Sequence, residues 1–281
     1  MRVVLRRAAA AYGIADDLLP AFDHCCHSGV QYGRLAVPCW GANTTRTEFA
    51  ALTGVEQAAL GFDRFNPYHA FARNPLPSLA WCLRRAGYRT LCLHPFDRRF
   101  FGRNRVMANL GFDAFLGEEV FTGATRSGLY VADAEVARIG AELLREEGPS
   151  VFVFAITMQN HGPWPGGGKR NGSRAPASVS EAEGLRAYLR GLKGADTMLR
   201  TLSNFLATEF GDGLLAFWGD HLLSFPASFA EFGFADPRTD YLIWRPRCSP
   251  AACRDLRAHE LPKTLWDHVC RSDGVREGTR G

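Results

Sequence analysis

The sequence predicts an α/β protein with a largely parallel central sheet and helices on both faces of that sheet. Short apolar runs typical of strands alternate along the chain with segments whose apolar residues recur at helical spacing. Some of these runs, such as 150–158, are apolar at almost every position, as strands buried on both faces are. Alternation of strands with helices indicates parallel strands joined by helical crossovers.

The size and composition are those of a globular protein. The chain has 281 residues, of which 46% are hydrophobic and 22% charged, and we expect one domain over 1–281 with a disordered tail at 272–281. The net charge of +4 is spread along the chain, which argues against a nucleic-acid partner. No apolar run reaches the about 18 residues of a membrane span, and no clear signal peptide is present. The eight cysteines show no spacing that settles their redox state.

The pattern of the first part of the chain predicts a helix that starts at Asp16 and Asp17, followed by a strand and a second helix. A loop rich in aromatic residues then covers the site, and a helix and a strand follow it. In chain order these segments are 14–28, 30–38, a helix opened by 41–49, 54–75, 76–85 and 88–93.

The second part continues the alternation of helices and strands. It contains a Gly-rich surface loop between the predicted strand at 150–158 and a long helix. The segments are a helix at 131–147, a strand at 150–158, the loop at 165–178, a helix at 180–209, strands at 214–218 and 241–244, and a helix at 260–270.

The turn Gly41–Phe49 is unusual because small and hydroxyl residues connect a strand to a helix. Backbone N–H groups at the start of a helix attract anions, so a hydroxyl at this point can meet a bound anion. By itself, Thr44 is either the N-cap of the helix or a nucleophile. Glu48 is interpreted as the carboxylate of a capping turn.

Ionisable residues also follow several predicted strands. Ligands of parallel α/β sheets bind beyond the carboxyl ends of the strands, so we expect these side chains to converge. A carboxylate next to an imidazole suits Zn or Mn, and an arginine can hold a phosphate or sulfate through two hydrogen bonds. Each motif alone also fits an ordinary turn or a surface residue. The residues concerned are Thr44, His94, Asp97, Arg103, His161, Asp220 and His221.

Four segments in this order resemble the sulfatase-like phosphoglycerol transferases, the lipoteichoic acid synthase group of the alkaline-phosphatase superfamily. The first is similar to the small-x-Thr-x-x-x-Glu-Phe turn of that group, and the fourth to its Gly-Asp-His metal motif. The second and third are similar to a His-then-aromatic-x-Arg pattern and a Thr-x-x-Asn-His-x-Pro turn. The matching positions are Thr44; His94, Asp97, Phe101 and Arg103; His161; and Asp220 and His221.

This resemblance implies a transferase or hydrolase acting on a phosphodiester or sulfate ester. Phosphoglycerol or phosphoethanolamine would be moved to an envelope glycan or lipid in two steps. Thr44 would be the nucleophile and, with Asp220 and His221, would hold one divalent metal, Mn or Zn, with Mg or Ca as alternatives. The resemblance also implies a place at the bacterial cell envelope, near the membrane. Further implied roles are substrate binding for Arg103, Asp97 and Phe101, and proton donation for His161 or His94.

The N-terminal region departs from the family pattern. The family carries a strand ending in an acidic metal ligand and usually transmembrane helices, whereas no carboxylate precedes Asp16 here. We therefore expect a domain that is N-terminally truncated relative to the family and binds metal more weakly. Two alternatives remain open. One is a phosphomutase or phosphodiesterase of the same superfamily, and the other is a non-catalytic module that binds a polysaccharide or a lipid headgroup.

Overall fold

The computed structural model describes residues 2–15, 17–162, 177–248 and 251–272. Asp16, the tail from residue 273 onward and most of the predicted Gly-rich loop lie outside the described residues. No helix in the described part of the chain combines the length and apolar composition needed to cross a bilayer.

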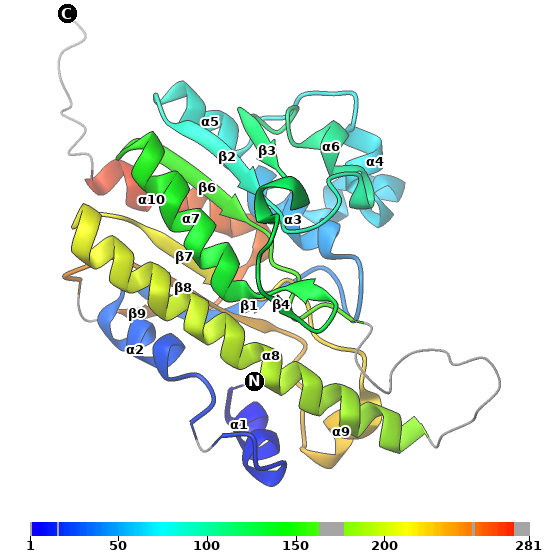
Figure 1. The fold of residues 1–281 in the computed structure, drawn as a ribbon. Helices are drawn as coiled ribbons and strands as arrows, with labels where there is room; N and C mark the ends of the chain where they lie inside the picture. Colours follow the sequence, from blue (N-terminus) through cyan, green and yellow to red (C-terminus); the bar gives the residue numbers. More distant parts are fainter. Residues whose placement is uncertain (1, 16, 163–176, 249–250, 273–281) are drawn as a thin grey trace, which may run out of the picture.

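Two sheets form the centre of the fold (Figure 1). The larger has the order β10-β1-β8-β7, with β9 beside β1, and the second has the order β3-β2-β6. All pairings in these sheets are parallel except those of β8, which runs antiparallel to β1 and β7. The predicted largely parallel α/β fold is thus confirmed. The strands are β1 (Gln31–Ala36), β2 (Arg89–Leu93), β3 (Ala114–Leu116), β6 (Val151–Ala155), β7 (Leu215–Trp218), β8 (Thr239–Trp244), β9 (Ala252–Cys253) and β10 (Leu256–Arg257).

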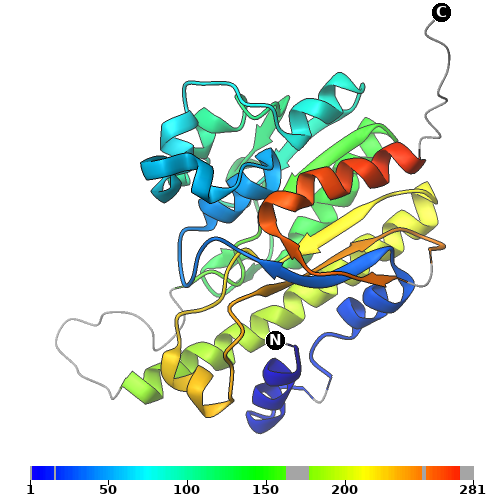
Figure 2. The same cartoon turned by 180° about the vertical axis from the view of Figure 1, so that it is seen from behind.

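Helices cover both faces of the sheets (Figures 1 and 2). The alternation of β8 shows how the sequence produces this arrangement, because successive side chains of a strand point to opposite faces. Tyr241 and Ile243 pack toward α3, α5 and α10, whereas Leu242 and Trp244 pack toward α2, α7 and α8. The bounds are α2 (Pro20–Ser28), α3 (Thr44–Thr53), α5 (Leu79–Arg85), α7 (Asp133–Glu147), α8 (Ala177–Phe205) and α10 (Leu261–Ser272).

Shorter elements join these layers and surround the site. A small hairpin, β4 (Arg126–Ser127) with β5 (Tyr130–Val131), lies in the connection before α7. The turn after α8 continues as a π-helix, η4 (Leu206–Phe210). The remaining short helices are α1 (Arg2–Ala11), η1 (Gln57–Phe65), α4 (Pro67–Phe71), η2 (Phe100–Gly102), α6 (Arg103–Val106), η3 (Glu118–Phe121), α9 (Pro226–Glu231) and η5 (Ala258–Glu260).

Strands β6 and β7 run side by side in the same direction (Figures 1 and 2), although each is the last strand of its own sheet. The Phe154 and Trp218 rings bridge the two strands with centroids 6.0 Å apart. The prediction that these strands are buried on both faces is wrong for most of their residues. Val151–Val153 and all of β7 are half-buried and Ala155 is exposed, because each strand has a paired neighbour on one side only in the described part of the chain.

Two further predictions differ from the structure, one on where a helix starts and one on an irregular region. The helix expected from residue 14 begins only at Pro20, since Leu19 has non-helical angles (φ −136°) and proline favours the first helical position. The region 54–75, expected to be irregular, contains η1 and α4. The start of α4 is fixed by the Asn66 side chain, which accepts a hydrogen bond from the His69 backbone.

Candidate active site

Thr44 is the first residue of α3, and its side chain is half-buried. Asn43 occupies the cap position in the left-handed conformation, with φ of 69°, and makes no side-chain cap bond. The Thr44 hydroxyl lies 3.3 Å from the His221 Nε2 atom. Because Asn43 and not Thr44 occupies the cap position, the N-cap role is wrong for Thr44, and its role as a nucleophile stays a prediction.

The neighbouring threonines are in different environments. Thr45 and Thr47 are both buried. The Thr47 hydroxyl donates a 2.6 Å hydrogen bond to the Asp220 carbonyl, so it fixes the backbone of the Gly-Asp-His turn. Thr44 is therefore the hydroxyl of this turn that faces His221 and remains half-accessible.

Asp220 and His221 follow β7 and lie next to Thr44. The Asp220 Oδ1 atom accepts from the His221 backbone N–H at 2.9 Å, and its Oδ2 atom lies 3.4 Å from His221 Nε2. His221 Nδ1 donates to the Leu222 carbonyl at 2.9 Å, which leaves the Nε2 lone pair directed toward Thr44 and Asp220.

This arrangement bears directly on the expected metal. A carboxylate oxygen, an imidazole nitrogen with a free lone pair and a hydroxyl converge, and these donors fit a divalent cation. Within the described residues, however, no group of three or more His, Cys, Asp or Glu side chains is positioned to hold a metal. The chain thus offers Asp220 and His221 as a partial ligand set.

Glu48 lies one helical turn after Thr44 and is buried, so the expectation that it caps the helix is wrong. Its Oε2 atom accepts from the Tyr68 hydroxyl at 2.9 Å and from Arg103 Nε at 3.0 Å, and its Oε1 atom accepts from Arg103 Nη2 at 2.5 Å. The physical reason is that a buried guanidinium requires a counter-charge, and Glu48 supplies it.

Arg103 is only 1% exposed, so its guanidinium is almost completely removed from solvent. With Nε and Nη2 on Glu48, Nη1 lies 3.4 Å from both His94 Nε2 and the Phe100 carbonyl. The guanidinium also lies over the Phe100 and Phe101 rings, 5.7 and 5.3 Å from their centroids. The predicted contact of Arg103 with a substrate anion stays a prediction.

His94 is completely buried after β2. Its Nδ1 atom lies 3.1 Å from the Ile156 carbonyl, which accepts the Nδ1 proton, and its Nε2 atom faces Arg103. Burial, followed by the positive charge of Arg103, lowers the pKa of His94 to about 4. The imidazole is therefore neutral near pH 7, with both nitrogens engaged, and is poorly suited to protonate a leaving group.

His161 is the more accessible of the two histidines. Its Nδ1 atom lies 2.5 Å from the Gly162 carbonyl and 3.4 Å from the Tyr130 hydroxyl, which itself donates to the same carbonyl at 2.6 Å. The ring packs edge-on against Phe100 and Tyr130. Since no hydrogen bond occupies Nε2 within the described residues, that nitrogen can exchange a proton with a ligand.

Asp97 lies in the loop after β2, and Phe101 lies in η2, just before α6. Asp97 forms a two-fold hydrogen-bonded pair with Arg99, and these hydrogen bonds lower the pKa of Asp97 to about 2. Phe101 has an uncommon positive φ of 57° and is 42% exposed. The structure thus brings Thr44, Asp220 and His221 together, and separately Arg103, His94 and Phe101. It shows no contact between Asp97 and these groups in the described part.

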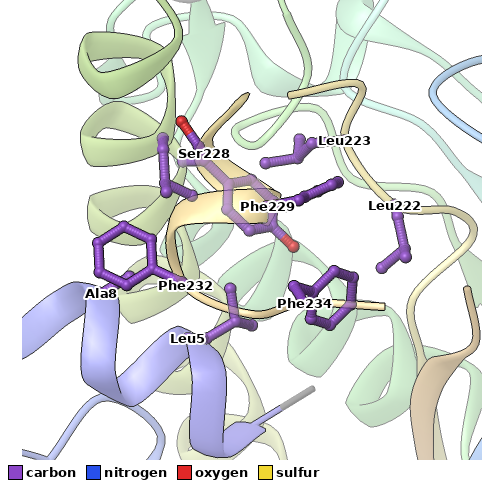
Figure 3. Close-up of a pocket in the computed structure, with 10 residues that line it drawn as sticks. Leu5, Ala8, Leu222, Leu223, Ser228, Phe229, Phe232 and Phe234 are labelled. Carbon is purple, nitrogen blue, oxygen red and sulfur yellow. The ribbon is translucent and has the colours of Figure 1, made fainter. Parts of the chain in front are cut away.

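A small apolar pocket lies beside the Gly-Asp-His turn at residues 219–221 (Figure 3). Side chains of α1, α8 and α9 line it together with Leu222 and Leu223, the residues that follow His221. The Ser228 and Tyr188 hydroxyls are the polar side-chain groups of its lining. Without a cationic side chain among these residues, this cavity is not a place for a charged ester.

The contacts of Glu48, Tyr68 and Tyr130 at the site were not predicted from the sequence. The spacing of Glu48, four residues after Thr44, was available as a signal, because residues at this spacing share one face of a helix. Tyr68 and Tyr130 come from segments with no regular pattern, and only the fold brings them to the site.

The fold and site define a member of a known family. The sulfatase family model matches residues 10–268, so the chain belongs to the sulfatase family. The structure is similar to the lipoteichoic acid synthase LtaP from Listeria monocytogenes, with a TM-score of 0.71 and 16% identity over 94% of this chain and 68% of that one. It is also similar to the phosphoglycerol transferase GacH from Streptococcus pyogenes, with a TM-score of 0.70 and 23% identity over 90% and 68%. These structural likenesses support the alkaline-phosphatase-like fold.

Two curated relatives come from Rhizobium meliloti. The chain is 38% identical over 240 residues to the capsular polysaccharide biosynthesis protein RkpI, covering 83% of this chain and 42% of the relative. It is 32% identical over 247 residues to a putative cyclic beta-1,2-glucan modification protein, covering 85% and 37%. The chain thus spans less than half the length of these relatives.

Proposed function

We propose that this chain cleaves or transfers a phosphodiester or sulfate ester, with Thr44 as a covalent nucleophile. The observation that carries the proposal is the half-accessible Thr44 hydroxyl, at the N-terminus of α3 and 3.3 Å from His221 Nε2. A hydroxyl at this place meets an anion that the helix N-terminus attracts. Neither of the neighbouring buried threonines offers this combination.

In the first step the Thr44 Oγ1 atom gives up its proton to solvent and forms a bond to phosphorus or sulfur, and the bond between that phosphorus or sulfur atom and the leaving alkoxide oxygen breaks. His161 is the proton donor to the alkoxide, because its Nε2 atom is accessible whereas His94 is held neutral in the interior. Water or an acceptor hydroxyl then releases the group from Thr44. The Nη1 edge of Arg103 and the exposed Phe101 ring are the proposed substrate contacts, with Asp97 at the rim of the site.

Asp220 and His221 are the residues that would hold a divalent metal, Mn or Zn, with Mg or Ca as alternatives. When bound, such an ion polarises an ester oxygen and favours ionisation of a nearby hydroxyl. Thr47 supports this set by fixing the Asp220 backbone, and the Leu222 carbonyl by fixing the His221 tautomer.

The relatives suggest the biological setting. The names of two of them refer to capsular polysaccharide biosynthesis and to glucan modification. A periplasmic domain of EcEptC from Escherichia coli shares the fold, with a TM-score of 0.61. We therefore place the activity at the bacterial cell envelope, with phosphoglycerol or phosphoethanolamine transferred to a glycan or lipid. A module that only binds a glycan or headgroup is the competing outcome.

Removing single hydroxyls tests the nucleophile. The chain is assayed with bis(p-nitrophenyl) phosphate and added Mn²⁺, and any adduct is mapped by mass spectrometry. Thr44→Val should lower the rate by about 10³-fold or more, as expected for losing a nucleophile, and should abolish the adduct. Because Thr44 caps nothing, the cost in unfolding free energy should be below the about 1 kcal/mol of a lost cap.

Thr45→Val is the matched control, and it should retain a large part of the rate. An adduct mapped to Thr45 or Thr47 would move the nucleophile. No turnover and no adduct with any divalent metal would favour the binding module instead.

A further inference from the structure

Exposed aromatic side chains gather on neighbouring short helices. Five large apolar side chains are exposed in the described part of the chain, and three of them belong to η1 and η2. Phe62 and Phe65 on η1 are 92% and 58% exposed, and Phe101 on η2 is 42% exposed. α4 contacts both of these short helices as well as α6. Single exposed apolar residues are common, whereas a group of them indicates an interaction surface.

The turn that presents Phe62 is specified by the sequence. Gly61 has φ of 54° and ψ of −126°, a conformation that glycine adopts without strain, and it breaks η1 in the middle. All six residues from 61 to 66 are exposed as a result. The Gln57 amide donates to the Arg64 carbonyl at 3.2 Å and accepts from Arg46 on α3. These bonds tie the turn to α3, so the fold itself holds the two phenylalanines in water.

The positive charge of the protein is concentrated in the same part of the chain. Residues 57–107 contain nine arginines, no lysine and two acidic residues, which gives a net charge of +7. The whole chain carries +4, so all other residues together carry −3. The expectation that the net charge is spread along the chain is therefore wrong.

Three of these arginines lie on the short helices or the loop between them. Arg64, Arg73 and Arg105 are exposed, and none of them pairs with an acidic side chain in the described part of the chain. The Arg64 guanidinium lies 4.9 Å from the centre of the Phe65 ring. The Asn109 side chain donates to the carbonyls of Ala72 and Arg105, at 2.8 and 3.4 Å, and so holds the loop after α4 against α6. Figures 1 and 2 show α4 and α6 beside each other, at the end of the molecule away from α1 and α9.

This combination of side chains distinguishes between possible anionic partners. A phenylalanine has no polar group, and it gains free energy only where its ring leaves water. The boundary between lipid headgroups and acyl chains accepts such rings, while arginines beside them bind the lipid phosphates. A soluble polyanion would pair with the arginines and leave the Phe62 ring in water. The observations therefore favour a lipid surface.

We propose that this surface docks the protein on an anionic lipid bilayer. Phe62 and Phe65 insert at the level of the headgroups, and Arg64, Arg73 and Arg105 bind lipid phosphates. α4 lies between this surface and η2, so docking brings the exposed Phe101 ring close to the headgroups. The inference goes beyond the proposed function and does not depend on the chemistry of Thr44.

Binding of the full chain to lipid vesicles tests the phenylalanines. Vesicles of phosphatidylcholine with phosphatidylglycerol should bind more tightly than phosphatidylcholine alone, and high salt should weaken the binding. The double variant Phe62→Ser with Phe65→Ser should weaken it by about 10-fold or more, because two apolar side chains no longer leave water. Phe62→Trp should retain binding, since tryptophan suits the membrane interface. The matched control is Leu129→Ser, which changes a leucine that is 64% exposed on the β4–β5 hairpin and should have no effect.

A second set of variants tests the arginines. Replacing Arg64, Arg73 and Arg105 with Gln one at a time should each weaken binding to the anionic vesicles by about five-fold. Binding to phosphatidylcholine alone should change little. The matched control is Arg190→Gln, because Arg190 is exposed on α8. All of these positions are exposed, so thermal melting should show an unchanged fold.

Several results would overturn the inference. One is the absence of binding to anionic vesicles. Another is binding that the Phe62→Ser and Phe65→Ser double variant leaves unchanged while dextran sulfate competes fully, which would indicate a site for soluble polyanions. A third is an equal loss in the Leu129→Ser or Arg190→Gln controls, which would indicate nonspecific adsorption. None of these results bears on ester cleavage, so the proposed function can stand or fail separately.

Discussion

The two sides of this site hold polar groups in opposite ways. On the open side, His221 Nε2 lies 3.3 Å from the Thr44 hydroxyl and 3.4 Å from Asp220 Oδ2, and the Asp220 side chain is 40% exposed. On the closed side, Glu48, Arg103 and His94 are buried and bonded to one another or to the backbone. The open side can therefore exchange ligands and protons with solvent, whereas the closed side is fixed when the protein folds.

The two histidines show the same contrast. His161 presents a nitrogen that makes no hydrogen bond within the described residues, whereas His94 uses both nitrogens internally and has a pKa lowered to about 4. Strand-end position predicted both residues equally well. Burial separates them, and on this basis we propose proton transfer for His161 on the open side and a positioning role for His94 on the closed side.

The largest stability effect should come from breaking the buried pair. Arg103→Met leaves the Glu48 carboxylate buried without its counter-charge, and the expected loss in unfolding free energy is about 3–5 kcal/mol. Urea denaturation at pH 7 measures it. The matched control is Arg138→Met, which removes an arginine that pairs on the surface with Glu135 and Glu142 and should change stability little. Equal losses in the two variants would remove the distinction between a closed and an open side.

A pH series tests the closed side through His94. Its pKa falls from 6.5 in the unfolded chain to about 4 in the fold. Between these values the unfolded chain binds more protons, so the stabilisation is complete above pH 6.5 and is lost as the pH falls toward 4. Unfolding free energy should drop by about 3 kcal/mol over this range from His94 alone.

The variant His94→Gln should flatten that part of the curve, because glutamine can donate to the Ile156 carbonyl and accept from Arg103 without titrating. His161→Gln serves as the open-side control and should keep the slope. A slope that disappears in His161→Gln but persists in His94→Gln would exchange the roles of the two histidines.

Much of the fold was predictable from the sequence for a physical reason. Apolar runs such as those of β2 and β7 and the helical spacing of α7 are local patterns, and the structure places them within a few residues of the predicted bounds. α1 and the short parallel strands β9 and β10 were missed. Their formation depends on partners distant in the chain, as in the pairing of Leu35 with Leu256.

For the site, the structure shows the expected meeting of Thr44, Asp220 and His221, but the sequence did not predict that Arg103 and His94 form a separate buried group or how each is paired. Thr44 and His221 lie next to each other after the C-terminal ends of β1 and β7, as expected from their positions just beyond predicted strands. The partner of Arg103 was not predictable. Glu48 is 55 residues away in the chain, and only the folded structure shows that both side chains are buried together, so that Arg103 pairs with Glu48. For the same reason the Glu48 carboxylate was mistaken for part of a cap.

The smallest of these effects should be on metal affinity, and it tests the open side. Asp220 and His221 are expected to bind one divalent ion, but with few protein ligands in the described residues the binding should be moderate. Asp220→Ala should weaken Mn²⁺ or Zn²⁺ binding by about 10–100-fold or more, judged from what even outer ligands contribute. Calorimetry on the purified, chelator-treated chain gives the affinity, and elemental analysis gives the stoichiometry.

Because the Asp220 side chain is partly exposed, Asp220→Ala should cost far less stability than Arg103→Met. If the Asp220→Ala variant still binds one metal ion per chain with unchanged high affinity, the ion is bound elsewhere. Asp220 and His221 would then not be the ligands that make the open side exchangeable.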